Sequence, residues 1–145
     1  MTRYLKLVFG FSMSFAPFSR EQAFTITVAS FAKTLQKHPH IVQDGEWMPV
    51  LFRGTLAECM RLAPLGGTDF RQGPLKTVQE ALIRLSPGDK ALLLFRDQCH
   101  FSFETIGSIL GTGSQESRSA CLAARERLRG ALKEILAKPE AGHGV

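Results

Sequence analysis

The chain has 145 residues, of which 44% are hydrophobic and 21% are charged. Its length allows one or two small domains, and its composition is that of a globular protein, which excludes a disordered chain. The net charge of +5 permits binding to nucleic acid without requiring it. No apolar run reaches the ~18 residues of a membrane-spanning helix, so no membrane span is expected.

The N-terminal half predicts three helices. Residues 2–12 form the first, whose buried side consists of Tyr4, Leu5, Val8 and Phe9, and residues 10–18 are rich in Ser, Phe, Gly and Pro and predict a turn. Ser19 is an N-cap for a second helix that runs to about Lys37. Its predicted apolar face consists of Ala23, Phe24, Ile26, Val28, Phe31 and Leu35. A third helix covers residues 47–62, with Pro49 in its first turn and Trp47 in the core.

Residues 64–74 predict a linker, because this stretch is rich in glycine and proline and has no apolar periodicity. A helix over residues 75–85 follows, with Val78, Leu82 and Leu85 facing inward. Pro87 opens the next helix, which ends at the break formed by residues 99–101. Residues 139–145 predict a disordered tail.

The last two helices carry the most specific pattern. Ser102 caps a short helix that stops at Gly111-Thr112-Gly113, and Ser114 caps the following helix, with Glu116 in its first turn. Two helices joined by such a glycine-containing turn are typical of the helix-turn-helix, whose second helix enters the major groove of DNA. Its predicted inner face consists of Cys121, Ala124, Leu128, Leu132 and Ile135. The side chains expected to bind DNA are Ser114, Gln115, Arg118, Ser119, Leu122 and Arg125.

Three stretches of this half resemble the promoter-binding region 4 of bacterial extracytoplasmic-function (ECF) sigma factors. LSPGDKALLLFRD is similar to the family's L-P-x-x-x-R-x-x-L-x-L-R, and FSFETIGSILG to L-S-Y-x-E-I-A-x-x-L-G. SRSACLAARERLRGAL is similar to V-K-S-R-L-x-R-A-R-x-x-L. In the N-terminal half, SREQAFTITVASFAKTLQK and EWMPVLFRGTLAECMRL resemble segments of region 2 more faintly.

The resemblance implies an all-α fold of two small helical domains. Residues 1–63 would form a region 2-like domain, and residues 75–138 a region 4-like helix-turn-helix, a three- or four-helix bundle similar to a winged helix without its wing. It implies a cytoplasmic factor that binds promoter DNA and the RNA polymerase core, and that an anti-sigma factor could control. Arg118 stands at the family's lysine position and Ser119 is kept, while Arg125 matches the family's arginine or forms a salt bridge within the domain with a helix neighbour. Arg127 and Arg129 are expected to be solvated.

Two other functions remain open. The family's acidic run is largely replaced here, by Ser19, Gln22, Thr25 and Ile26. An acidic surface needs several charges to bind a basic partner, because each exposed ion pair contributes only about 0–1 kcal/mol. The chain could therefore be a sigma-like module that binds a protein partner and has weaker DNA and polymerase binding. A dimeric helix-turn-helix repressor or activator ranks third, because the sequence indicates no dimerisation helix.

An enzyme is not expected, because no nucleophile–base pair or phosphate-binding loop occurs. The three cysteines are widely spaced, which argues against a disulfide framework and favours a reducing cytoplasm. The four histidines do not form a metal-ligand spacing with them, so neither a metal nor another cofactor is expected. These residues are Cys59, Cys99 and Cys121, with His38, His40, His100 and His143.

Overall fold

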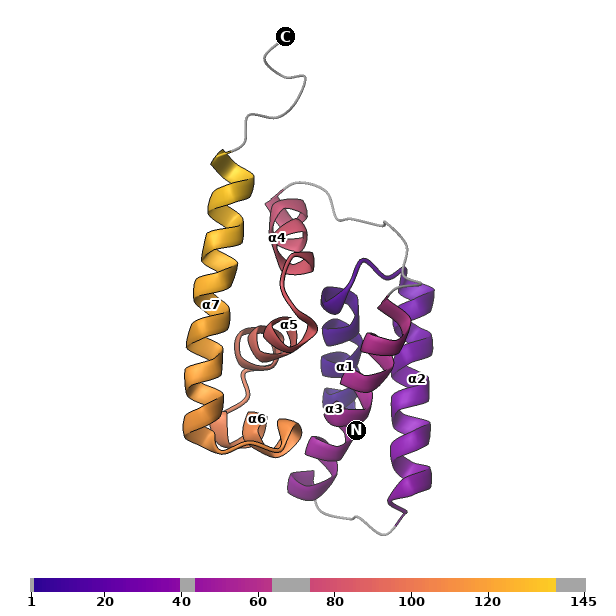
Figure 1. The fold of residues 1–145 in the computed structure, drawn as a ribbon. Coiled ribbons are helices and arrows are strands. Elements are labelled where there is room, and N and C mark those ends of the chain that lie inside the picture. Colours follow the sequence, from indigo (N-terminus) through magenta and orange to yellow (C-terminus); the bar gives the residue numbers. More distant parts are fainter. Residues whose placement is uncertain (1, 40–43, 64–73, 138–145) are drawn as a thin grey trace.

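The computed structural model describes residues 2–39, 44–63 and 74–137, and throughout these ranges the chain forms helices and no strand (Figure 1). The predicted all-α class is therefore confirmed. Apart from Pro74, the predicted linker lies outside the described residues, as does the predicted tail.

Helix α1 (Thr2–Phe15) continues past residue 12, where the sequence predicts its end. Phe11 and Phe15 are fully buried, so the added residues bring one more large ring, that of Phe15, into the core, and this packing outweighs the local preference of Gly10 for a turn. Gly10 also allows a close approach, since a Cβ there would lie 3.1 Å from Nε2 of Gln98. The predicted turn over residues 10–18 is wrong as far as Phe15.

The buried side of α1 is rotated from the predicted one. Tyr4 and Val8 are buried as expected, but Leu5 is exposed and Phe9 is only half-buried. The buried positions recur every three or four residues through Tyr4, Val8, Phe11 and Phe15, as one face of a helix requires.

Helix α2 (Arg20–Lys37) begins as predicted after Ser19. The Ser19 hydroxyl accepts a hydrogen bond from the backbone N–H of Gln22, and the Gln22 side chain accepts one from the backbone N–H of Ser19. This reciprocal pair is a capping box. The predicted apolar face is wrong in part, because Phe24, Val28 and Leu35 point outward. The buried positions of α2 are instead small or hydroxylated, apart from one isoleucine: Ala23, Ile26, Thr27, Ser30 and Thr34.

Helix α3 (Asp44–Leu62) begins three residues before the predicted start, so Pro49 lies inside the helix and not in its first turn. Trp47 is buried, as predicted, with its ring 6.0 Å from that of Tyr4 and 5.4 Å from that of Phe31. These contacts join the first three helices at one end.

Helix α4 (Pro74–Ile83) is followed by α5 (Pro87–Leu93), which continues into a short π-helical segment, η2 (Leu94–Gln98). Pro87 opens α5 as predicted, and the Ser86 hydroxyl accepts from the N–H of Asp89. Leu82 and Leu85 are buried as expected. The prediction for Val78 is wrong, because its side chain is exposed.

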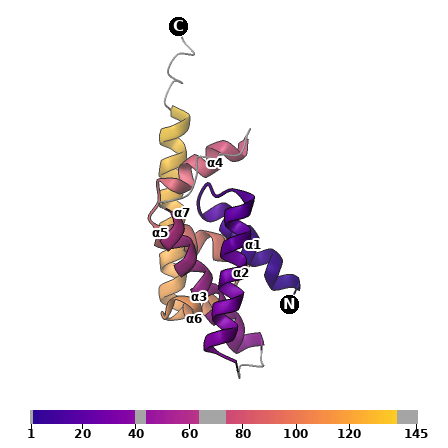
Figure 2. The ribbon, with the colours of Figure 1, turned by 90° about the vertical axis from the view of Figure 1, so that its right-hand side faces the viewer.

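The N- and C-terminal halves share one hydrophobic core. Phe95 of η2 stacks on Phe11 of α1 with ring centroids 4.8 Å apart, and Phe52 of α3 meets Phe101 edge-on at 4.9 Å. Helix α7 (Ser114–Ala137) lies on one flank of the molecule and α2 on the other (Figure 1). Figure 2, which views the second flank, shows α2 in front of the helices that form the core.

Candidate nucleic-acid interface

Helix α6 (Phe103–Leu110) has both of its ends defined by local hydrogen bonding. The Ser102 hydroxyl accepts from the backbone N–H of Thr105 at 3.1 Å, which confirms the predicted N-cap. Gly111 has φ 76°, the left-handed conformation that glycine adopts without steric cost. Its N–H donates to the carbonyl of Gly107, so the helix ends where the sequence predicts.

The turn after α6 packs directly against Gly107. A Cβ at this position would lie 2.5 Å from the carbonyl oxygen of Thr112, closer than any real contact allows. The Thr112 N–H donates to the Gly107 carbonyl at 2.9 Å, and the Thr112 hydroxyl lies 2.9 Å from that of Ser117. These contacts attach the turn to α6 and to the first turn of the next helix.

Helix α7 (Ser114–Ala137) begins at Ser114 itself, so the prediction that Ser114 caps it from outside is wrong. Gly113 precedes the helix, and its carbonyl accepts from the N–H of Ser117. The predicted inner face is confirmed at Cys121 and Ala124, which are buried. Further along, Ala131 is buried, and three predicted positions are only half-buried: Leu128, Leu132 and Ile135.

Five of the six predicted DNA-binding residues are exposed on α7: Ser114, Gln115, Arg118, Ser119 and Leu122. Arg118 forms no ion pair within the described part of the chain. The N-terminal half of the protein does not cover this surface, because α2 and α7 occupy opposite flanks (Figure 1). The five side chains form a largely polar surface that includes one arginine and one leucine, called the α7 face below.

Arg125, the sixth residue, is half-buried and donates to Asp97 at 2.7 Å. An ion pair within the domain is therefore present, but its partner belongs to η2, 28 residues away along the chain, and is not the expected helix neighbour. Arg127 is exposed, as expected, and one of its nitrogens also lies 2.8 and 2.9 Å from the two carboxylate oxygens of Asp89. Asp97 and Asp89 therefore offset part of the positive charge of α7.

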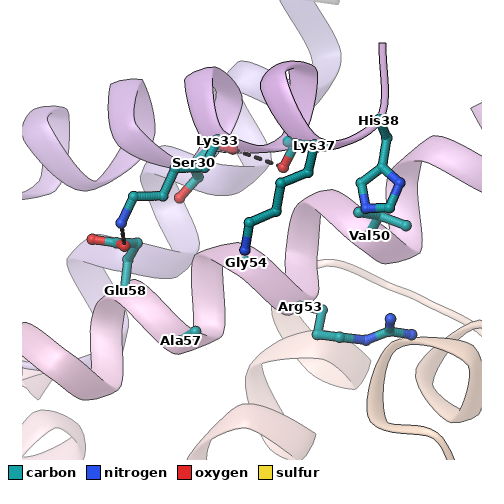
Figure 3. Close-up of a pocket in the computed structure, with 10 residues that line it drawn as sticks. Ser30, Lys33, Lys37, His38, Val50, Arg53, Gly54, Ala57 and Glu58 are labelled. Carbon is teal, nitrogen blue, oxygen red and sulfur yellow. Dashed lines mark hydrogen bonds and ion pairs between the residues drawn. The ribbon is translucent and has the colours of Figure 1, made fainter. Parts of the chain in front are cut away.

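A second polar site, which the sequence does not predict, is a cavity of about 290 Å³ between α2 and α3 (Figure 3). Glu58 lies at its edge, buried, with its carboxylate shared between Lys33 and Arg61. Burial alone would raise the pKa of Glu58, but the hydrogen bonds and charges of Lys33 and Arg61 outweigh it and hold the pKa below its usual value. Only the three-dimensional packing indicates this site, because the glutamate and its first partner are 25 residues apart.

Arg53, which also lines this cavity, joins α3 to α6. Its Nε donates to the carbonyl oxygen of Ile109 at 2.9 Å and its Nη2 to that of Ser108 at 2.7 Å. Carbonyls in the last turn of a helix have no partner within the helix, and a cation there also interacts favourably with the helix dipole. Arg53 thereby fixes the N-terminal half against the end of α6, next to the turn.

The cysteine thiols are buried in the hydrophobic core and are expected to be unreactive. All three are free and buried, and burial raises the pKa of Cys59 and of Cys99 to about 12. Thiols in this state are poor nucleophiles and poor metal ligands at neutral pH. Over the described ranges no three His, Cys, Asp or Glu side chains group as metal ligands would. No helix in the same ranges has the length and hydropathy to cross a membrane.

Comparison with models of known protein families, with curated proteins and with solved structures found no match for this chain.

Proposed function

We propose that this protein binds double-stranded DNA through the α7 face and acts as a promoter-recognition factor of the ECF sigma type. The observation that carries the proposal is the exposure of Arg118 and Ser119 on the first turns of α7, directly after a tight turn from α6. In a helix-turn-helix, these turns of the second helix contact base edges.

The side chains of the α7 face suit that role. Arg118 can donate two hydrogen bonds to guanine or grip a phosphate, and Gln115 can pair with adenine. Ser114 and Ser119 are short hydroxyl donors of the kind that bond phosphate oxygens. Leu122 offers an apolar surface to a thymine methyl group.

The sigma assignment is the finer part of the proposal and rests on the sequence resemblance. Such a factor needs no catalytic group, since it works by binding the promoter and the polymerase core. Its test is a pull-down of core RNA polymerase at physiological salt, followed by promoter-dependent transcription in vitro. If neither occurs while duplex binding is retained, the sigma assignment fails and DNA binding stands.

Duplex binding itself is tested by fluorescence anisotropy with a short labelled duplex, titrated with salt. A binder that neutralises several phosphates loses affinity steeply as salt rises. If the arginine contacts a base, Arg118→Ala should weaken the free energy of duplex binding by about 1–3 kcal/mol. If it contacts a phosphate, the substitution should reduce the slope of log affinity against log salt concentration by about one. Arg3→Ala, an exposed arginine on α1, is the matched control and should change neither quantity. Absence of salt-dependent binding would contradict the proposal.

A sigma-like module that binds a protein partner, such as an anti-sigma factor, is the second candidate. It is favoured by the outward side of α2, where Phe24 and Val28 are exposed, and by the replacement of the family's acidic run at Ser19, Gln22 and Thr25. It is also favoured by the two ion pairs that offset charge on α7. A flat salt response in the duplex titration supports this candidate against the first.

A further inference from the structure

The cavity between α2 and α3 is open because α3 carries small residues where it faces the last turns of α2. Gly54 and Ala57 line it, and a Cβ at Gly54 would meet only the Thr34 hydroxyl oxygen within 4 Å, at 3.6 Å. Alanine is the better helix former at such an interior position, so helix stability does not account for the glycine. With a volume of about 290 Å³, this space, called the α2–α3 cavity below, lies at the small end of ligand pockets.

Positive charge dominates the lining of the α2–α3 cavity. Among the described residues that line it, Glu58 is the one carboxylate, and its charge is shared between Lys33 and Arg61. Two cations therefore offset one anion at that end. Val50 is the one large apolar side chain among the same lining residues. The basic side chains that line the cavity are Lys33, Lys37, His38 and Arg53.

Lys37 supplies a charge that the described part of the chain does not neutralise. It is exposed and forms no ion pair or hydrogen bond within that part. Figure 3 shows its side chain reaching from α2 toward Gly54 of α3, while Lys33 turns to Glu58. Glycine offers no side chain to the ammonium group, so the middle of the cavity carries a positive potential that attracts an anion.

Arg53 offers further donors from the opposite helix. A guanidinium has five N–H donors, and the contacts of Arg53 with the last turn of α6 use Nε and Nη2. Its Nη1 has no partner among the described residues. A ligand in the cavity can therefore accept a hydrogen bond from Arg53 while the link between α3 and α6 stays intact.

These charges decide the class of ligand. A cation would be repelled, and a neutral apolar molecule would remove water from the ammonium and guanidinium groups without replacing its hydrogen bonds. An anion accepts hydrogen bonds from both. A phosphate group presents oxygens in several directions, which suits donors that converge from two helices, whereas a carboxylate presents two oxygens in one plane. The volume admits a phosphate group with a small organic part.

We propose that the α2–α3 cavity binds a small molecule that carries a phosphate group, which Lys37 contacts from α2 and Arg53 from α3. The proposal does not depend on DNA binding. Because the lysine and the arginine are exposed at the rim, salt screens their charges, and the affinity falls as ionic strength rises.

Isothermal titration calorimetry of the full chain with pyrophosphate, at constant ionic strength, tests the site. Saturable binding of one pyrophosphate per chain is expected. Lys37→Ala should weaken it about tenfold, because a hydrogen bond to a charged group is lost, while Lys37→Arg keeps the charge and should retain most of the affinity. Lys133→Ala is the matched control: this lysine is also exposed and without an ion pair in the described ranges, but it lies on α7.

The shape of the site is tested separately by Gly54→Leu, which removes no charge. Its side chain should fill the cavity and weaken pyrophosphate binding about tenfold or more, while far-UV circular dichroism checks that the helices are retained. Absence of pyrophosphate binding overturns the proposal, as does binding that neither Lys37→Ala nor Gly54→Leu affects. Equal weakening by Lys133→Ala would show only a general attraction of anions to a basic protein and also overturns it.

Two other anions test the phosphate class. Citrate at the same ionic strength should bind more weakly than pyrophosphate, and equal affinity overturns the assignment to phosphate. A labelled duplex gives the remaining outcome. If pyrophosphate does not bind but Lys37→Ala lowers the salt dependence of duplex binding, the cavity contacts the phosphate backbone of nucleic acid, and the small-molecule proposal fails while DNA binding stands.

Discussion

The contact between Gly107 and the turn after α6 makes Gly107→Ala the sharpest test of the site's geometry. An alanine Cβ would lie 2.5 Å from the carbonyl oxygen of Thr112 and 3.3 Å from the carbonyl carbon of Gly113. Both atoms belong to the backbone, so they cannot move aside as the end of a flexible side chain would. Overpacking of this kind costs about 1–3 kcal/mol and outweighs the ~1 kcal/mol that alanine gains over glycine inside a helix. We expect a net loss of stability and a displaced turn.

The matched control is Gly130→Ala in α7, where a Cβ would have no neighbour within 4 Å. This exposed helical position should gain about 0.5–1 kcal/mol from the same substitution. Urea unfolding followed by far-UV circular dichroism measures both free energies, and duplex anisotropy measures the effect on binding. If Gly107→Ala is as stable as the wild type, the turn does not pack against α6 as described, and the reasoning about the α7 face loses its basis.

Three further substitutions test other parts of the argument. Phe95→Ala should lower the free energy of unfolding by about 3–5 kcal/mol and leave one cooperative transition, because this ring joins both halves of the core; two separate transitions in urea would refute the shared core. Asp97→Ala should raise duplex affinity a few-fold, because it frees the Arg125 guanidinium from its ion pair so that it can contact DNA. Anisotropy measures the affinity, and an unchanged value would place Arg125 outside the interface. Stability should fall as pH rises from about 9 toward 12, because unfolded thiols ionise while the buried thiols of Cys59 and Cys99 keep their protons. Each thiol should lower the free energy of unfolding by about 1.4 kcal/mol for every pH unit in this range. Urea unfolding at alkaline pH should therefore depend less on pH in the double variant Cys59→Ala/Cys99→Ala than in the wild type. An equal dependence would contradict the raised pKa values.

Much of the candidate site could be predicted from the sequence because its determinants are local. An N-cap needs one hydroxyl within three residues of the backbone N–H whose hydrogen bond it accepts. A helix that ends in a left-handed residue needs one glycine. Ser102 and Gly111 therefore placed the ends of α6, and the 3.6-residue period placed Arg118 on the outer side of α7. The state of Arg125 could not be predicted, since its partner Asp97 is 28 residues away.

The sequence by itself determined that this chain folds into helices, where most of them begin, and which side chains of α7 face outward. Each of these properties depends on residues within a turn or two of one another. Only the tertiary structure decided that α1 extends to Phe15, that Phe24 and Val28 remain outside the core, and that Glu58 is buried between two cations. The physical reason is that an apolar side chain can be buried only where another element covers it, and the sequence of one helix does not say which of its sides will be covered.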